Sequence, residues 1–157
     1  MPAGKSCKAF LNIGGTLASP TWVEMRRISN VSRPKSRSTS DRMFRGAKNK
    51  KKVTGYLEYT FSFQYVPAKA GSAAATADTV LAALEASLEN ELTLDAAFMD
   101  RAIATVGAKG VRGPMMCTKL DRTEDDESSV VFDVELVEVE HEDSAGALVE
   151  IAPYTIV

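Results

Sequence analysis

A run of alternating residues at positions 53–66, VTGYLEYTFSFQYV, is the strongest structural signal in the chain. Apolar and aromatic residues share one parity (Val53, Leu57, Tyr59, Phe61, Phe63 and Tyr65), and polar residues share the other (Thr54, Glu58, Thr60, Ser62 and Gln64). Because successive side chains of a strand point to opposite faces, this pattern predicts a half-buried β-strand. At roughly 3.3 Å per residue it would extend about 45 Å, about twice an ordinary strand. We expect such a strand to overhang its own core, or to join a sheet that another subunit completes.

Positive and negative charges are segregated along the chain, although the net charge is only -2. Residues 33–52 contain a single acid, Asp41, and carry the basic residues Arg33, Lys35, Arg37, Arg42, Arg45, Lys48, Lys50, Lys51 and Lys52. Acidic residues gather between positions 121 and 143, and the acidic surface that we predict there consists of Glu124, Asp125, Asp126, Glu127, Glu140, Glu142 and Asp143. Segregation of this kind bears on association rather than on fold. A basic projection and acidic turns are complementary in a head-to-tail contact, which generates stacks rather than closed dimers.

The basic stretch itself shows no periodicity. It carries Pro34, several serines and Gly46, and it is longer than the two to five residues of common hairpin connections. We therefore predict a long loop over residues 33–52, between two early strands. The plainer alternative is a mobile basic loop that is only solvated.

The other elements of the first half are less sharply marked. Residues 1–20 contain glycines and serines around a short apolar piece, and we expect a loosely ordered arm that docks on the sheet or on a neighbour. Residues 21–31 favour a strand with protein on both faces, in which Trp22 is a core or interface anchor. A helix is predicted over residues 77–90, because apolar residues recur there at three- and four-residue spacing and Asp78 or Thr76 can cap its start.

Further strands are predicted in the second half, at residues 92–99, 115–120, 130–141 and 148–157. Three glycines with Pro114 are expected to break the chain between the first two of them. A switch of apolar parity near Leu136 predicts a bulge or a change of partner strand. The fold class is thus α+β and mainly β: an antiparallel β-sandwich or barrel with one flanking α-helix, in a single domain of residues 1–157.

Residues that catalysis or metal binding would need are scarce. Cys7 and Cys117 are far apart and show no CxxC spacing, which predicts two free thiols. His141 is the chain's one histidine and lies at an acidic strand end, so we expect neither a catalytic triad nor a zinc site. The stretch GAKGVRG at residues 107–113 lacks the GK[ST] ending of a phosphate-binding loop. We predict no enzyme, no metal and no cofactor.

The composition, with 45% hydrophobic and 25% charged residues, is ordinary for a soluble globular domain. The N-terminal residues show no sustained apolar core, and no stretch is long enough to span a bilayer. We therefore expect no secretory signal and no membrane partner.

The order of these features resembles a known family. A strand with an early Trp22 precedes a long polar loop and the long strand at residues 53–66. An Ala-rich linker, one helix at residues 78–89, a strand at residues 92–99, Gly-rich and acidic connections, and a hairpin-like terminal pair of strands follow. This order is similar to that of the tail tube (major tail) proteins of tailed bacteriophages. Their fold is shared by tube components of contractile injection systems and type VI secretion.

The resemblance implies hexameric rings that have a continuous β-barrel as inner wall and stack into a tube through which DNA or effectors pass. Residues 33–52 would then be the inter-ring loop, and the wall strands at residues 21–31 and 53–66 would supply Trp22, Glu24, Tyr56, Glu58, Thr60, Ser62 and Gln64. The family does not require so dense a Lys/Arg run, so this loop either meets an acidic surface of the next ring or remains in solvent.

The same resemblance implies where the protein acts and with what. Its partners would be further copies of itself in stacked homo-hexamer rings, together with tail terminator, tape measure and baseplate or tip proteins. DNA would pass through the lumen without specific binding. The protein would reside in the virion tail and assemble in the cytoplasm of the bacterial host.

A nucleic-acid-binding module is the alternative, and it depends on the same basic stretch, which also contains Met43 and Phe44. Lys and Arg contacts to phosphates give affinity that is independent of sequence and sensitive to salt. Against this function, the sequence pI is about 5.5, and the aromatics of residues 53–66 are expected on the core face. An enzyme of unrecognised type is the third option.

Overall fold

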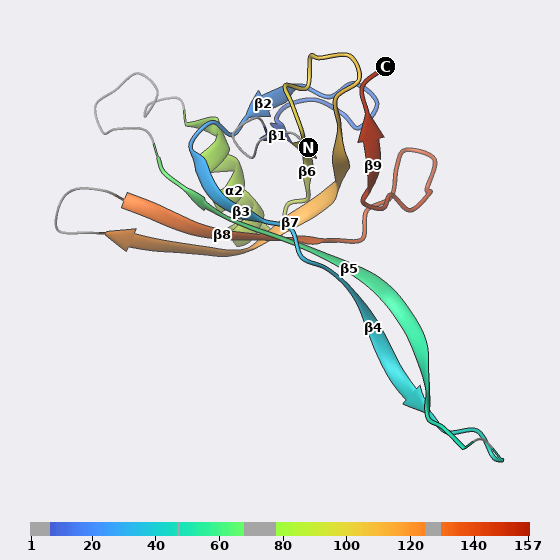
Figure 1. The fold of residues 1–157 in the computed structure, drawn as a ribbon. Helices are drawn as coiled ribbons and strands as arrows, with labels where there is room; N and C mark the ends of the chain where they lie inside the picture. The colour runs from blue at the N-terminus through green and yellow to red at the C-terminus, as the bar shows by residue number, and fades with distance from the viewer. Residues whose placement is uncertain (1–6, 47, 68–77, 125–129) are drawn as a thin grey trace.

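The computed structural model describes residues 7–46, 48–67, 78–124 and 130–157. In this part of the chain most strands join one antiparallel sheet in the order β2-β1-β6-β7-β8-β5-β3, with β4 added to β5 and β9 to β7 (Figure 1). The elements are β1 (Lys8–Asn12), β2 (Trp22–Glu24), β3 (Ile28–Ser32), β4 (Lys35–Arg42), β5 (Lys51–Tyr65), α2 (Thr79–Asn90), β6 (Leu94–Met99), β7 (Lys109–Glu124), β8 (Val130–Glu138) and β9 (Ala152–Thr155). The predicted fold class, mainly β with a flanking helix, is confirmed.

The inner half of β5 forms the centre of the core. Phe61, Phe63 and Tyr65 are all buried, as their shared parity predicts. The Phe61 ring stacks on the ring of Phe98 from β6, with 4.4 Å between ring centroids and 9° between ring planes. The predicted long strand is therefore confirmed, but its apolar face is buried only from Phe61 onward, and residues 51–56 are exposed.

The predicted loop at residues 33–52 is wrong for residues 35–42, which form β4, and for Lys51 and Lys52, which begin β5; the described residues between the two strands belong to neither. This strand pairs antiparallel with the outer half of β5, from Arg42 opposite Lys51 to Lys35 opposite Tyr59. Every residue of β4 is exposed. A strand with solvent on both faces has no reason to alternate apolar and polar residues, so periodicity could not reveal it.

The N-terminal segment also differs from the expectation of a loosely ordered arm. Strand β1 lies inside the sheet between β2 and β6, with Ala9, Phe10 and Leu11 buried. Residues 1–6 lie outside the described part of the chain. The predicted strand over residues 21–31 is two strands, β2 and β3, with a turn at residues 26–27 between them. Just before this turn, the buried Met25 donates its backbone N–H to the carbonyl of Ala9 (2.9 Å).

Of the three glycines expected to break the chain, Gly107 lies in a turn with positive φ before β7, whereas Gly110 and Gly113, like Pro114, lie inside the continuous strand β7. A Cβ on Gly110 would lie 2.1 Å from the carbonyl oxygen of Phe98, so glycine permits a close approach of two backbones. Pro114 sits where β7 changes its neighbour from β9, which pairs up to Arg112, to β8, which pairs from Met115. Proline has no N–H to donate, and Gly113 and Pro114 are the two positions at which neither β9 nor β8 is paired with β7 in register.

The two terminal strands do not form a hairpin with each other. Strand β8 pairs with β5 and β7, whereas β9 pairs with β7. The irregularity predicted near Leu136 lies in the partner strand, where the register of β7 shifts between Cys117 and Lys119. There the Cys117 N–H bonds to the buried hydroxyl of Ser87 on α2 (3.0 Å), which fastens the helix to the sheet. Both cysteines are free, as predicted: Cys7 is exposed and Cys117 is buried.

The predicted helix is confirmed as α2, and its start is tied to the inner end of β5. The Asp78 carboxylate accepts a hydrogen bond from the Leu81 N–H (3.2 Å) and another from the Tyr65 hydroxyl (2.6 Å). Burial, together with this carboxylate, raises the pKa of Tyr65 above its ordinary value of 10.0. Folding therefore favours the protonated phenol.

This coupling predicts an alkaline loss of stability that Tyr65→Phe removes. The folded-state pKa exceeds the unfolded one, so the stabilisation is complete below about pH 10 and is lost as pH rises further. Above pH 10 the free energy of unfolding of the native chain should fall up to about 1.4 kcal/mol per pH unit more steeply than that of the variant. Urea unfolding between about pH 8 and pH 11 measures both slopes. Parallel curves would contradict the coupling.

Candidate assembly surfaces

A two-stranded arm extends from the sheet into solvent (Figure 1). This basic arm comprises the described residues of 33–59: β4, the outer half of β5 and the connection between them. The nine cations that the sequence singled out all lie on it and are all exposed: Arg33, Lys35, Arg37, Arg42, Arg45, Lys48, Lys50, Lys51 and Lys52. The structure thus brings the predicted basic residues together.

Few interactions beyond backbone pairing support the basic arm. Lys35 lies over the Tyr59 ring at 5.2 Å from its centroid, and Arg37 donates to the Gly55 carbonyl (3.3 Å). Among the described residues, none of its Lys or Arg side chains lies within 4.0 Å of a carboxylate. An isolated hairpin is at best marginally stable in water. A basic arm with unneutralised cations therefore favours a second surface that completes it.

The basic arm also exposes apolar side chains and unpaired backbone. Met43 and Phe44, near its tip, are 73% and 53% exposed, and Tyr56 is 88% exposed. Strand β5 pairs with β8 only from Thr60 to Tyr65, so residues 51–59 have an unpaired edge on that side within the described sheet. Unpaired edges invite pairing with another chain.

The predicted wall residues fall into two groups. Thr60, Ser62 and Gln64 are half-buried on the face of β5 opposite the core side chains, and Gln64 donates to Asp133 (3.1 Å). Tyr56 and Glu58, of the same strand, lie on the exposed basic arm. The other two, Trp22 and Glu24, lie on β2 at the opposite end of the strand order.

The predicted acidic residues do not form one surface. Glu124 ends β7 beside the start of β8, whereas Glu140, Glu142 and Asp143 follow the far end of β8. Residues 125–127 lie outside the described part of the chain. The Asp143 carboxylate accepts hydrogen bonds from the N–H groups of Ala147 (2.9 Å) and Ala145 (2.8 Å), which lower its pKa from the ordinary value. Asp143 thus has a local role in its turn.

Sequence reasoning missed a groove at the base of the basic arm. Its lining combines residues 57–60 of β5, residues 137–140 at the end of β8, and residues 148–150, around a hollow of about 500 Å³. The pairing of β5 with β8 brings the first two segments together, and the bond from the Val149 N–H to the His141 carbonyl (2.8 Å) holds the third beside the end of β8.

Sequence reasoning also missed Arg112, which lies in the glycine-rich stretch that lacks phosphate-loop features. Its guanidinium forms a two-point contact with Asp95 (3.0 and 2.7 Å) and donates to the Leu17 carbonyl (2.7 Å). The rings of Trp22 and Tyr154 lie 4.9 and 5.2 Å from it. Burial lowers the pKa of Arg112, but the Asp95 carboxylate outweighs burial and holds that pKa above its ordinary value.

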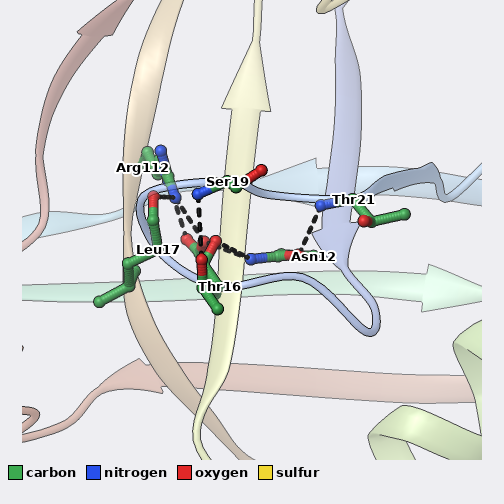
Figure 2. Close-up of polar contacts among 7 residues, drawn as sticks. Asn12, Thr16, Leu17, Ser19, Thr21 and Arg112 are labelled. Carbon is green, nitrogen blue, oxygen red and sulfur yellow. Dashed lines mark hydrogen bonds and ion pairs between the residues drawn. The ribbon is translucent and has the colours of Figure 1, made fainter. Parts of the chain in front are cut away.

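This Arg112 cluster fixes the connection between β1 and β2 to the sheet, as Figure 2 shows. Asn12 donates to Asp95 (3.1 Å) and to the Thr16 carbonyl (3.0 Å), and it accepts from the Thr21 N–H (2.8 Å). A hollow of about 890 Å³ borders the cluster. Because the Arg112 charge is already matched by Asp95, the hollow offers no free cation for an anionic ligand at this point. Trp22 is an anchor, as predicted.

The described residues contain neither a cluster of metal ligands nor a membrane-spanning helix. No group of three or more His, Cys, Asp or Glu side chains there is arranged to hold a metal ion. The helix of the described part is too short and too polar to cross a membrane.

Comparison with known proteins gives a structural likeness. No protein-family model and no curated protein matches the chain. Among solved structures, a chain of the SPP1 tail tube matches with a TM-score of 0.70 at 10% identity, covering 100% of this chain and 81% of that one. A chain from the tail of an empty gene transfer agent particle gives a TM-score of 0.63 at 12% identity, covering 97% and 100%. The chain has a tail-tube fold.

The same fold extends to a chain of the anti-feeding prophage baseplate, with a TM-score of 0.56, 11% identity, and coverage of 99% of this chain and 97% of that one. The resemblance drawn from element order is therefore confirmed at the level of fold. The matched proteins are parts of tails and a baseplate.

The Arg112 cluster predicts a large difference between two arginine substitutions. Arg112→Ala leaves Asp95, whose side chain is 11% exposed, without its partner, and should lower the free energy of unfolding by about 3–5 kcal/mol. Arg101→Ala removes a more exposed arginine, paired at 3.8 Å with Asp100, and should cost less than about 1 kcal/mol. Urea unfolding measures the free energy of unfolding of each variant. Equal losses would show that the cluster does not hold the tail-tube fold together.

Proposed function

We propose that this chain is the structural subunit of a phage-type tail tube, not an enzyme. Its copies assemble into hexameric rings, and the rings stack head-to-tail into a conduit for DNA. The observation that carries the proposal is the tail-tube fold over nearly the whole chain, combined with an exposed arm that its own molecule leaves unsupported.

Ring formation agrees with the sheet, which does not close on itself among the described strands. The gene transfer agent tail was solved with helical refinement and C6 symmetry, and the anti-feeding prophage baseplate was six-fold symmetrised. A ring of identical subunits uses up free strand edges, and a heterologous contact along the axis continues indefinitely. In this arrangement the basic arm is the inter-ring element.

The proposed tube function implies a location and a set of partners for the protein. The protein resides in the virion tail after assembly in the bacterial cytoplasm, and it meets a tail terminator, a tape measure and baseplate or tip proteins. DNA passes through the lumen without specific binding. No cofactor takes part.

One observation favours the second candidate, a nucleic-acid-binding module. The cations of the basic arm are exposed and lack ion pairs within the described residues, so they are available to phosphates. If the protein were such a module, its unassembled subunit would bind DNA tightly. A tube subunit should instead bind DNA weakly and polymerise. A filter-binding assay with duplex DNA distinguishes the two functions by the DNA affinity of the unassembled subunit.

Stacking through the basic arm should depend on its charge. We expect Lys50→Glu with Lys52→Glu to abolish stacking, while Lys50→Arg with Lys52→Arg preserves it. Raising salt from about 0.1 M to about 1 M shortens the Debye length from about 10 Å to about 3 Å, and it should weaken stacking of the native chain. Light scattering and negative-stain electron microscopy measure stack length. Tubes that form equally in all these cases would exclude the charge mechanism.

A further inference from the structure

The groove at the base of the basic arm is chemically distinctive. Its floor is apolar, with Leu57, Val137 and Val139 half-buried and Leu148 63% exposed. Its rim carries carboxylates from three separate segments: Glu58, Glu140 and Glu150 are exposed, and Glu138 is half-buried. A volume of about 500 Å³ lies within the roughly 300–1,000 Å³ of typical binding pockets.

The exposed rim carboxylates have no cation of their own. Among the described residues, no Lys or Arg lies within 4.0 Å of Glu58, Glu140 or Glu150. Glu138 differs, because it accepts a hydrogen bond from the Ile151 N–H (2.7 Å) and so holds the chain after β8 in place. The groove therefore suits a ligand with apolar side chains flanked by positive charges.

The tip of the basic arm has this chemistry. The exposed side chains of Met43 and Phe44 are adjacent in sequence, with Arg42 and Arg45 on either side. Apolar side chains could fill the groove floor while the two arginines meet the rim, and charge complementarity of this kind fixes register and orientation. Nucleic acid is the less suitable occupant, because its phosphates would face the carboxylates.

The arm of one molecule cannot reach the groove of the same molecule. The groove includes Leu57 and Thr60, whereas the tip lies beyond Lys51 at the far end of the same strand. At about 3.3 Å per residue, Thr60 and Lys51 are about 30 Å apart, so an arm cannot fold back to its own groove without leaving β5. A copy displaced by at least about 30 Å along the arm would present its groove to the tip.

We propose that the acidic groove formed by residues 57–60, 137–140 and 148–150 receives the Met43–Phe44 tip of the basic arm from a second copy of this chain. The proposal rests on the proposed function, since it names the acceptor for the inter-ring arm. Each subunit then has one tip and one acceptor, a heterologous contact that propagates along the stack.

A mixing experiment with two variants tests this contact. The tip variant carries Met43→Ser and Phe44→Ser, and the groove variant carries Glu140→Lys and Glu150→Lys. Each should raise the protein concentration needed for stacking at least about tenfold. Each variant keeps one intact half of the contact, so an equal mixture should form short two-layer stacks, visible by electron microscopy. The controls lie outside the arm, the groove and the predicted wall and acidic residues. They are Val106→Ser, at an apolar side chain that is 74% exposed, and Glu89→Lys, at an exposed position of α2, and both should stack normally.

The outcomes are distinguishable. Urea unfolding checks that each variant folds. We expect all of them to fold, because the substituted side chains are exposed. If the native chain forms tubes and either variant stacks as the native chain does, the groove is not the acceptor, although the tube function stands. If both variants fail and their mixture stays unstacked, the tip does not meet the groove. If the native chain forms neither rings nor tubes under any condition, the proposed function itself fails.

Discussion

The stacking of Phe61 on Phe98 decides where β5 stops being part of the body and becomes part of the basic arm. From Phe61 inward, the strand lies between β3 and β8 and carries the largest buried side chains of the core. Outward of Thr60, it pairs only with β4 among the described strands, and residues 51–56 are exposed. One continuous strand thus lies in two environments, and the core contacts the arm at its base, where the Tyr59 ring stacks on Phe61 with 6.4 Å between ring centroids.

The elements that could be predicted from the sequence are those with one face buried in the core and the other exposed to solvent. The inner half of β5 and helix α2 each have one buried and one exposed face, so their apolar residues recur with the right period. Strand β4 could not be found this way, since its residues are exposed on both faces. Strand β1 was missed for a related reason: Ala9, Phe10 and Leu11 are buried consecutively, so they do not alternate, and the neighbouring glycines suggested a loop.

The candidate surfaces were predictable only in part. The cations of the basic arm are contiguous in sequence, so charge counting found them. The Arg112 cluster draws on β2, β6, β7 and β9, and the acidic groove on three separate segments, so neither leaves a local pattern. Gly110, Gly113 and Pro114 in β7 suggested a chain break because glycine and proline commonly occur in turns. Here Gly110 permits close packing, and Pro114 fills a position that needs no donor.

The attachment of β5 also determines how the molecule resists mechanical force. A pull on the arm acts along the strand axis, and the ladders to β3 and β8 run alongside that axis. Their hydrogen bonds are therefore loaded together in shear rather than opened one after another. At the inner end of the strand, the Tyr65 hydroxyl passes tension to the cap of α2 through Asp78. In a filament linked through such arms, each arm would therefore be held to its own subunit by hydrogen bonds that share the load.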